Sequence, residues 1–251
     1  MAKINKVDKS KNTTTNKSNV MKCIILNGPI NRAAIAKRTF LSIPSVMTIT
    51  DDLIARDLVQ AVGKGKSSGG KRPELLSVIA ESEYYVGVDI GRGTVRLVIV
   101  DLSQKVVFGT REATGEIQPP EAFVNRLCSF VLRCIQESGI DTGKIAGIGI
   151  AMPGLIEQET GHVIFSPDFA WSDVPLQEWA QSKLPYPVIV ENANRALALA
   201  ESQYEINTEK TVLCVNMGHG IGAAMVQAGT LYYGSSGTSG EIGHITVNKD
   251  G

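Results

Sequence analysis

The stretch VENANRALALAE, residues 190–201, places a carboxylate and an amide side by side where an apolar strand leads into an alanine-rich segment. Glu191 and Asn192 directly follow the run Pro187–Val190, which predicts a buried strand, and a helix is expected to begin near Asn192. Strand ends of this kind often present a carboxylate to a substrate. Ala193 stands where a catalytic acid or base is expected, and its methyl group can neither donate nor accept a proton. The stretch therefore predicts a polar binding site that lacks a catalytic group.

Two glycine-bearing turns add the chemistry of phosphate binding. The first, Gly91-Arg92-Gly93, follows an apolar strand that begins at Tyr84, and the second, residues 218–222, joins two further strands. Backbone amides approach a phosphate closely only where side chains are absent. Two such turns, far apart in the chain, are what a nucleotide clamp between two lobes requires.

Charge is distributed unevenly along the 251 residues, although the net charge is zero. Residues 1–72 hold 14 lysines and arginines against four aspartates, a net charge of +10, and the remainder holds 11 against 21, a net charge of −10. Such an asymmetry indicates that the basic part meets a polyanion while the acidic part has another task.

The basic part divides into a polar arm and a set of expected helices. Residues 1–18 offer few apolar side chains and predict a disordered basic arm. Residues 19–80 predict a winged helix-turn-helix domain, with helices near 20–26, near 32–38 and from Ser42 onward. Asn31 and Ser42 are suited to cap the second and third helices, and Pro44 is tolerated in a first turn.

The third helix is the expected recognition helix. Val46, Ile49 and Leu53 recur at helical spacing and define its buried side, with Thr50 a further candidate for the outward side. Asp51 and Asp52 are discordant there, because carboxylates repel phosphates. The predicted DNA contacts of the helical part are Arg32, Ser42, Pro44, Ser45, Met47 and Thr48.

A basic loop, GKGKSSGGKRP, lies between the apolar segments 58–62 and 74–78 and predicts a hairpin wing. Its cations suit phosphates or a minor groove, because small neighbours allow close backbone approach. A flexible linker between domains is the alternative interpretation of this loop. The loop adds four predicted DNA contacts, Lys64, Lys66, Lys71 and Arg72.

From Tyr84 onward the pattern becomes α/β. Expected strands near 84–91, 94–101 and 104–110 precede an amphipathic helix near 121–138 and a buried strand near 145–152. The four cysteines lie in apolar surroundings without metal-ligand spacing, and they predict reduced core thiols. No segment predicts a signal peptide or a membrane span, so a cytoplasmic location is expected.

Seven motifs, in order, resemble those of transcriptional regulators of the ROK family (repressor, open reading frame, kinase). They are NGPINRAAIAKRTFLSIPSVMTITDDLIARDLV, SSGGKRPELL, GVDIGRGT, GIGIAMPGLIEQETGHVIFSPDFAW, VENANRALALAE, NMGHGIGAAMV and GTSGEIGHI. The resemblance implies an α/β fold in which a winged helix precedes an actin/hexokinase-like (ribonuclease H-like) sugar-kinase domain. That domain is expected at residues 83–251, with a first lobe at 83–205 and an incomplete second lobe at 206–251.

The chain departs from the pattern of the family's kinases at three positions. Arg92 replaces the second glycine of a motif similar to Asp-Ile-Gly-Gly-Thr-Lys, and His219 replaces a threonine whose hydroxyl is expected to contact phosphate. Ala193 replaces the aspartate that acts as general base on the sugar hydroxyl. Phosphoryl transfer depends on positioning together with such a base. The resemblance therefore implies a domain that has no catalytic residue and is not an enzyme.

Sugar binding does not require these groups. The resemblance assigns contacts with sugar hydroxyls to Gly154, Asn192, Glu241 and His244. Amide, carboxylate and imidazole groups suit this task, because each can hydrogen-bond a hydroxyl. The alternatives are a plain turn glycine at position 154, a helix cap at position 192 and a surface loop at positions 241–244. His162 and His219 are interpreted as incidental loop residues.

Family members continue beyond this turn into a cysteine-rich loop that binds zinc together with the histidine equivalent to His244. This chain stops at HITVNKDG before any such cysteine, either through truncation or because the lobe is completed differently. A single histidine does not hold zinc, so we expect no metal site and no cofactor within the chain.

These observations favour a DNA-binding transcriptional regulator, a repressor of carbohydrate-utilisation genes, that senses a sugar through a catalytically inactive kinase-like domain. The expected partners are double-stranded operator DNA, a small sugar inducer and a second copy in a dimer. One alternative is an ATP-dependent sugar kinase with a DNA-binding appendage. Another is a truncated remnant that binds DNA without responding to a ligand.

Overall fold

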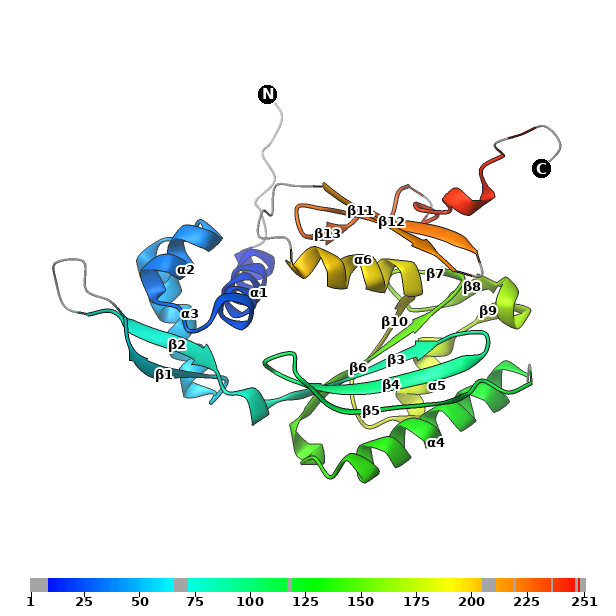
Figure 1. Ribbon diagram of the computed structural model, residues 1–251, viewed down its shortest axis with the longest axis horizontal. Coiled ribbons are helices and arrows are strands. Elements are labelled where there is room, and N and C mark those ends of the chain that lie inside the picture. Colours follow the sequence, from blue (N-terminus) through cyan, green and yellow to red (C-terminus); the bar gives the residue numbers. More distant parts are fainter. Residues whose placement is uncertain are drawn as a thin grey trace. The chain divides into compact units, whose positions relative to one another are not determined.

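The computed structural model describes residues 9–65, 72–116, 119–204, 211–218, 220–235, 237–246 and 248, without the side chains of residues 9–13 and 204. The described chain forms two compact units, whose elements are labelled in Figure 1. Unit 1 comprises the residues up to Glu83 together with Asp101–Lys105, and unit 2 comprises Tyr84–Val100 and the residues from Val106 onward.

Unit 1 contains three helices followed by a hairpin. Its elements are α1 (Lys9–Asn27), α2 (Arg32–Thr39), α3 (Ile43–Ala55), β1 (Val59–Lys64), β2 (Glu74–Val78) and the short 3₁₀ helix η1 (Ala80–Ser82). Asn31 Oδ1 accepts from the Ala34 amide at 2.9 Å, and Ser42 Oγ accepts from the Ser45 amide at 3.3 Å, so both expected caps are present. β1 and β2 pair antiparallel. The predicted three-helix region with its hairpin is confirmed.

The helix α1 is longer than its apolar residues predict. It begins at Lys9, so residues 9–18 are helical where a disordered arm was expected, and residues 1–8 lie outside the described part. Val20 and Ile24 are buried in the core of unit 1 and hold the second half of the helix. An ion pair between Lys17 Nζ and Asp52 Oδ2, at 2.9 Å, fixes the polar turn before them to α3. Helix propagation beyond a packed segment costs little, because nucleation is the unfavourable step.

The turn between β4 and β5 contributes to unit 1. Leu102 is only 4% exposed and belongs to the core of unit 1, and its amide donates to the carbonyl of Ala80 at 3.0 Å. The fully buried members of this core include Val20 of α1, Ile35 of α2, Val46 of α3 and Leu76 of β2. Local sequence patterns did not predict this role, since residue 102 lies beyond the first strand of unit 2.

Unit 2 is organised around a five-stranded sheet of order β10-β6-β3-β4-β5. The strands are β3 (Tyr84–Ile90), β4 (Thr94–Asp101), β5 (Val106–Ala113), β6 (Ile145–Met152) and β10 (Val188–Asn192). β3, β6 and β10 run parallel, whereas β4 and β5 pair antiparallel. The carboxyl ends of β3 and β10 therefore reach the same edge of the sheet, which carries the first glycine turn and Glu191.

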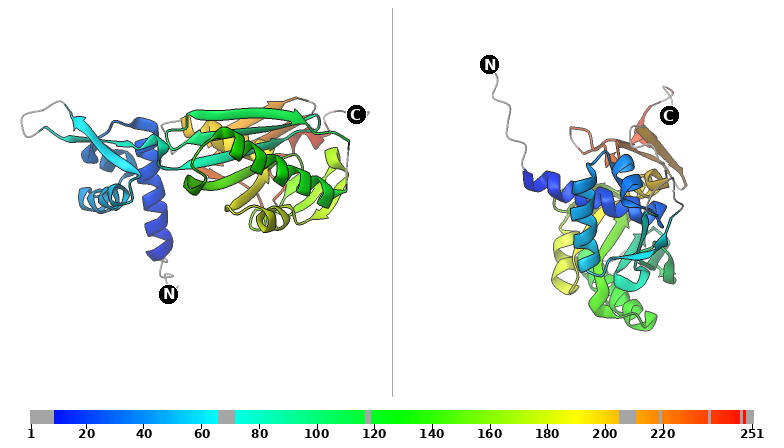
Figure 2. Two further views of the ribbon diagram at one scale, coloured as in Figure 1. Left: turned by 90° about the horizontal axis from the view of Figure 1, so that it is seen from below. Right: turned by 90° about the vertical axis from the view of Figure 1, so that its left-hand side faces the viewer.

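One face of this sheet is covered by α4 (Pro120–Ser138) and α5 (Leu176–Lys183), which Figures 1 and 2 show on the same side of the strands. Val86, Val88 and Ile90 of β3 are buried in one core with apolar residues of α4 and α5. Side chains alternate along a strand, so Tyr85 and Gly87 face the opposite side. Most of the core of unit 2 therefore lies between the sheet and these two helices.

The opposite side of the sheet carries α6 (Ala193–Tyr204) and a second sheet of order β11-β12-β13, as Figure 1 shows. The strands of this second sheet are β11 (Thr211–Met217), β12 (Ile221–Gln227) and β13 (Thr230–Leu231), all antiparallel. Ala198 of α6 packs against Ala224 and Val226 of β12. α6 thus joins the end of β10 to the hairpin that carries the second glycine turn.

A third sheet, formed by β7 (Leu155–Ile156), β8 (Val163–Ser166) and β9 (Trp171–Val174), was not predicted, and neither was α5. Strands of two to four residues are too short to show an alternating pattern. Three further 3₁₀ helices are η2 (Thr142–Lys144), η3 (Pro167–Phe169) and η4 (Ile242–His244). Within the described ranges, no helix is both long and apolar enough to cross a membrane. The predicted α/β class is confirmed.

Candidate functional site

The outward face of α3 carries the residues expected to contact DNA. All five predicted contacts at this helix are exposed: Ser42, Pro44, Ser45, Met47 and Thr48. Thr50, the further candidate, was wrong for this face because it is fully buried. Its Oγ1 donates to the carbonyl of Met47 at 3.1 Å and accepts from Arg32 Nε at 2.9 Å. The face offers hydroxyl groups and apolar atoms, which are suited to base edges in a major groove.

Arg32, another predicted DNA contact, is held by unit 1 itself. Its guanidinium donates to Glu74 Oε2 at 2.7 Å and to Asp51 Oδ1 at 2.9 Å, in addition to Thr50. Burial acts to lower the pKa of Arg32, but the hydrogen bonds with Glu74 and Asp51 raise it on balance. Arg32 therefore joins α2, α3 and β2, and this side chain is already paired within the protein.

The same ion pairs explain the two aspartates on the expected recognition helix. Asp51 is paired with Arg32, and Asp52 is paired with Lys17, whose hydrogen bond lowers the pKa of the Asp52 carboxyl. Both charges are compensated by cations of unit 1. They therefore repel a DNA phosphate less than the sequence suggested.

The wing is a hairpin on both sides of its basic loop. β1 and β2 pair antiparallel from Val59 and Val78 to Lys64 and Glu74, with a register shift between Ala61 and Gly63. The Gly65 amide donates to the carbonyl of Pro73 at 2.8 Å. Lys64 and Arg72 are exposed at the base of the loop. Lys66 and Lys71, the other two predicted DNA contacts here, lie outside the described residues. The paired flanks favour a wing over a flexible linker.

In unit 2, the first glycine turn follows β3. The Gly91 amide donates to the carbonyl of Thr94 at 3.0 Å, and Thr114 Oγ1 donates to the carbonyl of Gly91 at 2.6 Å. Asp89, two residues before the turn, accepts from Arg96 Nη1 at 3.1 Å. An arginine of the same sheet thus already compensates the carboxylate that precedes the turn. Arg92 is exposed within the turn.

Asn192 forms the junction between β10 and α6. Its Oδ1 accepts from the amides of Asn194 at 2.9 Å and Arg195 at 3.1 Å, which is the geometry of a helix cap. Its Nδ2 donates to the carbonyl of Gly154 at 2.8 Å. Asn192 is 6% exposed, so the side chain mainly holds the strand end, the helix and the Gly154 turn together. Ala193, next in the chain, is the first residue of α6.

The backbone conformation and the close neighbours of Gly154 require a glycine at this position. Its φ is +123°, and an added Cβ would lie 2.5 Å from the carbonyl oxygen of Phe165. A larger residue is therefore excluded by strain and by contact with β8. The hydrogen bond from Asn192 brings two of the four expected sugar contacts together.

The other two, Glu241 and His244, lie in the turn that packs on β12. The Ala223 amide donates to the carbonyl of Gly240 at 2.9 Å, and a Cβ at Gly240 would collide with the carbonyl of Ala223. Glu241 Oε2 and His244 Nε2 are 3.9 Å apart, with 47% and 81% of their side chains exposed. Both side chains are thus open to a ligand.

The start of α6 touches the strand that holds this turn. Asn194 Oδ1 accepts from Asn216 Nδ2 at 3.0 Å, and a Cβ at Gly222 would collide with the Asn194 amide group. A continuous set of contacts therefore runs from Gly154 through Asn192 and α6 to β12 and its turn. His219, between β11 and β12, lies outside the described residues. His162 pairs instead with Asp173, 2.8 Å from Nε2 to Oδ1, in the β7–β9 sheet.

Sequence patterns did not single out Arg195, which the structure buries to 3% exposure within this set of contacts. Its Nη1 lies 3.4 Å from Glu191 Oε1, and its Nη2 donates to the carbonyl of Gly237. The i,i+4 spacing of glutamate and arginine across VENANRALALAE was the available signal.

His244, which the family resemblance linked to zinc, has one acidic side chain near it. Among the described residues, no group of three or more histidine, cysteine, aspartate or glutamate side chains is close enough to hold a metal ion. His244 has Glu241 near it, and two such groups are fewer than the three or four protein ligands of a zinc site.

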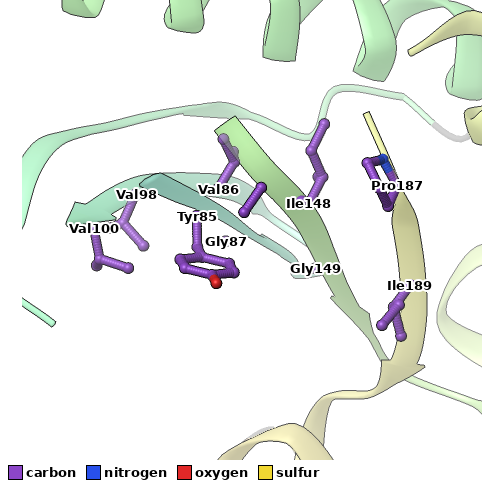
Figure 3. A pocket seen from close by; sticks show the side chains of 11 residues that line it. Tyr85, Val86, Gly87, Val98, Val100, Ile148, Gly149, Pro187 and Ile189 are labelled. Carbon is purple, nitrogen blue, oxygen red and sulfur yellow. The ribbon is translucent and has the colours of Figure 1, made fainter. Parts of the chain in front are cut away.

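A separate apolar groove of about 430 Å³ lies on the sheet face opposite α4 and α5. Figure 3 shows Tyr85 and Val98 on one side of it and Ile189 on the other, with Gly87 and Gly149 between them. The lining has no carboxylate, amide side chain or imidazole to select a sugar. The groove is therefore not the candidate sugar site.

Comparison with known proteins relates this arrangement to one family. The sequence profile of the ROK family matches residues 85–251. The xylose repressor of Caldicellulosiruptor bescii is 32% identical over 234 residues, which are 93% of this chain and 59% of that protein.

Solved structures give the same relation. The crystal structure of a ROK family transcriptional regulator, a homologue of the Escherichia coli MLC protein, superposes with a TM-score of 0.77 at 26% identity, covering 95% of this chain and 61% of that one. A ROK family glucokinase from Streptomyces griseus, in complex with glucose and AMPPNP, gives a TM-score of 0.58 at 29% identity, covering 67% of this chain and 52% of that one. The chain thus spans 59% of the xylose repressor's length and 61% of the regulator's.

Proposed function

Because the chain belongs to the ROK family, we propose that it is a DNA-binding transcriptional regulator that responds to a sugar. It acts as a repressor of carbohydrate-utilisation genes, and it works as a dimer in the cytoplasm, where operator DNA is found. The observation that carries this proposal is the exposed polar face of α3 beside the β1–β2 wing, in a chain whose kinase-like unit has Ala193 at the position of a general base.

The DNA-binding part of the proposal is supported by the geometry of unit 1. α3 buries Val46 and Leu53 and exposes hydroxyl groups on its other side, as a recognition helix does. Lys64 and Arg72 stand exposed at the base of the wing, where cations neutralise phosphates and release counterions. A dimer is proposed because a single winged helix reads a short half-site, and two half-sites give useful specificity.

The sugar-sensing part is supported by the hydrogen bond between Asn192 and Gly154 and by the exposed side chains of the turn at 240–244. Glu241 and His244 are open to a ligand, and each can hydrogen-bond a sugar hydroxyl. The xylose in the name of the xylose repressor and the glucose bound to the related glucokinase favour a pentose or hexose as the ligand.

A DNA-binding series tests the first part. The full chain is titrated onto labelled fragments from the upstream region of its own gene, at several salt concentrations, with a scrambled fragment as control. We expect a complex that prefers the upstream fragment and weakens with a steep, linear dependence of log affinity on log salt. Equal binding of both fragments at moderate salt would show that the chain is not a sequence-specific regulator.

A sugar series tests the second part. Thermal unfolding is followed with D-xylose, D-glucose and N-acetylglucosamine, since a ligand that binds only the folded state raises the midpoint. A sugar that stabilises the chain must also change its DNA affinity, because coupling between two sites is reciprocal. Stabilisation without any change in DNA affinity would separate sugar binding from regulation.

An ATP-dependent sugar kinase is the second candidate, favoured by the likeness to the glucokinase structure. Two observations oppose it: Ala193 offers no base, and the carboxylate of Asp89 is paired with Arg96. Incubation with ATP, magnesium and the same sugars is expected to give no sugar phosphate. Steady turnover that scales with enzyme concentration would establish the kinase instead.

A further inference from the structure

Arg195 is a buried cation whose partners come from three separate segments of unit 2. Its Nη1 donates to the carbonyl of Ile156 at 3.2 Å and lies 3.4 Å from Glu191 Oε1, and its Nη2 donates to the carbonyl of Gly237. The guanidinium carbon lies 4.9 Å from the centre of the Tyr233 ring. A buried guanidinium requires such partners, because an unpaired charge is strongly unfavourable in the interior.

Each partner segment carries an expected sugar contact. Ile156 lies two residues after Gly154, and Glu191 directly precedes Asn192. Tyr233 and Gly237 belong to the segment that leads into Glu241. One side chain therefore touches all three segments, although Arg195 itself is remote from them in sequence except for Glu191.

The segment 232–240 is tied to β12 at its two ends. The Tyr232 amide donates to the carbonyl of Met225 at 2.8 Å, and the carbonyl of Gly240 accepts from the Ala223 amide at 2.9 Å. Between these ties, Tyr233 Oη donates to Glu191 Oε2 at 2.8 Å and Gly237 accepts from Arg195. Tyr233 and Gly237, which are described residues between these ties, are thus held by the Glu191–Arg195 pair.

The hydroxyl of Tyr233 can donate its hydrogen bond to Glu191 over a wide pH range. Burial, followed by the hydrogen bond and charge of Glu191, raises the pKa of Tyr233 to about 12. The hydroxyl therefore keeps its proton and continues to donate to Glu191 at neutral pH.

We propose that Arg195 is a positioning residue that holds the segment 232–240 so that Glu241 and His244 face the sugar. The inference rests on the proposed sugar-binding function and names the side chain that sets the geometry of that site. A guanidinium can do this because its planar fork donates in several fixed directions at once. A lysine at position 195 keeps the charge and cannot reach the same acceptors together.

Amide hydrogen exchange of the full chain without ligand tests the inference independently of any sugar. Arg195→Lys is expected to speed exchange at 232–246, and Tyr233→Phe, which keeps the ring and loses the hydroxyl, is expected to do so to a smaller extent. Arg133→Lys is the matched control, because Arg133 is an exposed arginine of α4 in the same unit. Equal exchange at 232–246 in all four proteins overturns the proposal.

A rescue experiment separates positioning from general stability. In Arg195→Ala, millimolar methylguanidinium is expected to restore slow exchange at 232–246, whereas the same concentration of sodium chloride is not. Faster exchange that extends equally to β3 and β6 in Arg195→Lys, and that methylguanidinium does not reverse in Arg195→Ala, would assign Arg195 a purely structural role.

Sugar titration then connects the segment to the ligand. With whichever of D-xylose, D-glucose or N-acetylglucosamine binds the wild type, Arg195→Lys is expected to weaken affinity about tenfold, the loss of roughly one good hydrogen bond. Unchanged affinity overturns the positioning role. If none of the three binds the wild type, the proposed sugar-sensing function is what fails, while the exchange result still decides whether Arg195 holds the segment.

Discussion

At the scale of single residues, Asn192 forms the helix cap that was one of its two predicted roles, together with a hydrogen bond to Gly154 that was not predicted. Its oxygen caps α6, and its nitrogen donates to the carbonyl of Gly154, so the amide is engaged on both sides. A sugar hydroxyl at this position would have to share these groups. The helix-cap alternative therefore describes the ligand-free geometry, and Asn192 acts on the site mainly by fixing Gly154 and the start of α6.

Substitution of Asn192 separates the two roles. Asn192→Ala removes the cap and leaves the Gly154 carbonyl without its donor, so the free energy of unfolding is expected to fall by roughly 1–3 kcal/mol. Asn192→Ser keeps an uncharged acceptor for the cap and loses the donor to Gly154, so a smaller loss is expected. Urea unfolding followed by circular dichroism measures both. Equal losses in the two variants would contradict a capping role.

Tyr233 gives a pH-dependent prediction. Its pKa is raised from 10.0 to about 12, chiefly by burial and then by Glu191, so the folded protein holds this proton more tightly than the unfolded chain. Its contribution to stability is thus present below pH 10 and is lost as the pH rises toward about 12. The free energy of unfolding of wild type should fall more steeply over this range than that of Tyr233→Phe. Tyr232→Phe, at a tyrosine that is 48% exposed, should keep the wild-type slope.

At the scale of elements, unit 1 depends on an arginine that bridges three of them. Arg32 starts α2, and its partners lie on α3 and β2. Ion pairs with exposed carboxylates contribute little singly, but this guanidinium also bonds the buried Thr50. The bridge sets how α3 and β2 meet within unit 1.

Arg32 variants distinguish a bridge from a DNA contact. Arg32→Ala is expected to lower the free energy of unfolding of unit 1 by about 1–2 kcal/mol, because Thr50, Asp51 and Glu74 lose a donor. Arg32→Ala is expected to leave the slope of log DNA affinity against log salt unchanged, because Arg32 is not expected to contact a phosphate. Arg38→Ala, at an exposed arginine of the same helix, is the stability control. If Arg32→Ala reduces the magnitude of this slope by about one, Arg32 contacts a phosphate after all.

At the scale of the whole molecule, the two units are not simply consecutive in the chain. Residues 101–105, between β4 and β5, belong to unit 1, and Leu102 lies in its core. The chain therefore leaves unit 1 after Glu83, returns at Asp101 and leaves again after Lys105. A fragment that ends at residue 83 lacks part of the core of unit 1.

Substitution of Leu102 tests this organisation. Leu102→Ala leaves a cavity in unit 1 and is expected to cost about 2–5 kcal/mol of that unit's stability. Hydrogen exchange should accelerate in α1, α3 and β2, with little change in β3 and β6. Leu132→Ala, at a leucine of α4 that is 40% exposed, is the control. Faster exchange confined to the sheet of unit 2 would show that Leu102 stabilises that sheet instead.

The sequence by itself determined the elements whose patterns are local. Helical spacing identified the exposed face of α3, turn-forming residues identified the wing and both glycine turns, and apolar runs identified β6 and β10. These patterns depend on residues only a few positions apart, so they can be recognised from the sequence alone. Together with the ordered motifs, they were sufficient for the fold class and the family.

Only the tertiary structure decided which polar side chains serve the fold and which remain open to ligands. Arg32 pairs with Glu74, and Arg195 donates to the carbonyl of Gly237. Leu102 packs in the core of unit 1. In each case the partners are too far apart in the sequence for a local pattern to predict the contact. The sequence does not show whether a charged side chain is solvated or paired, because pairing depends on where the folded backbone places its partner. In the folded chain, Arg32 is paired and Asn192 is buried, Glu241 and His244 are exposed, and Arg195 bonds to Ile156 and Gly237, which its spacing from Glu191 did not indicate.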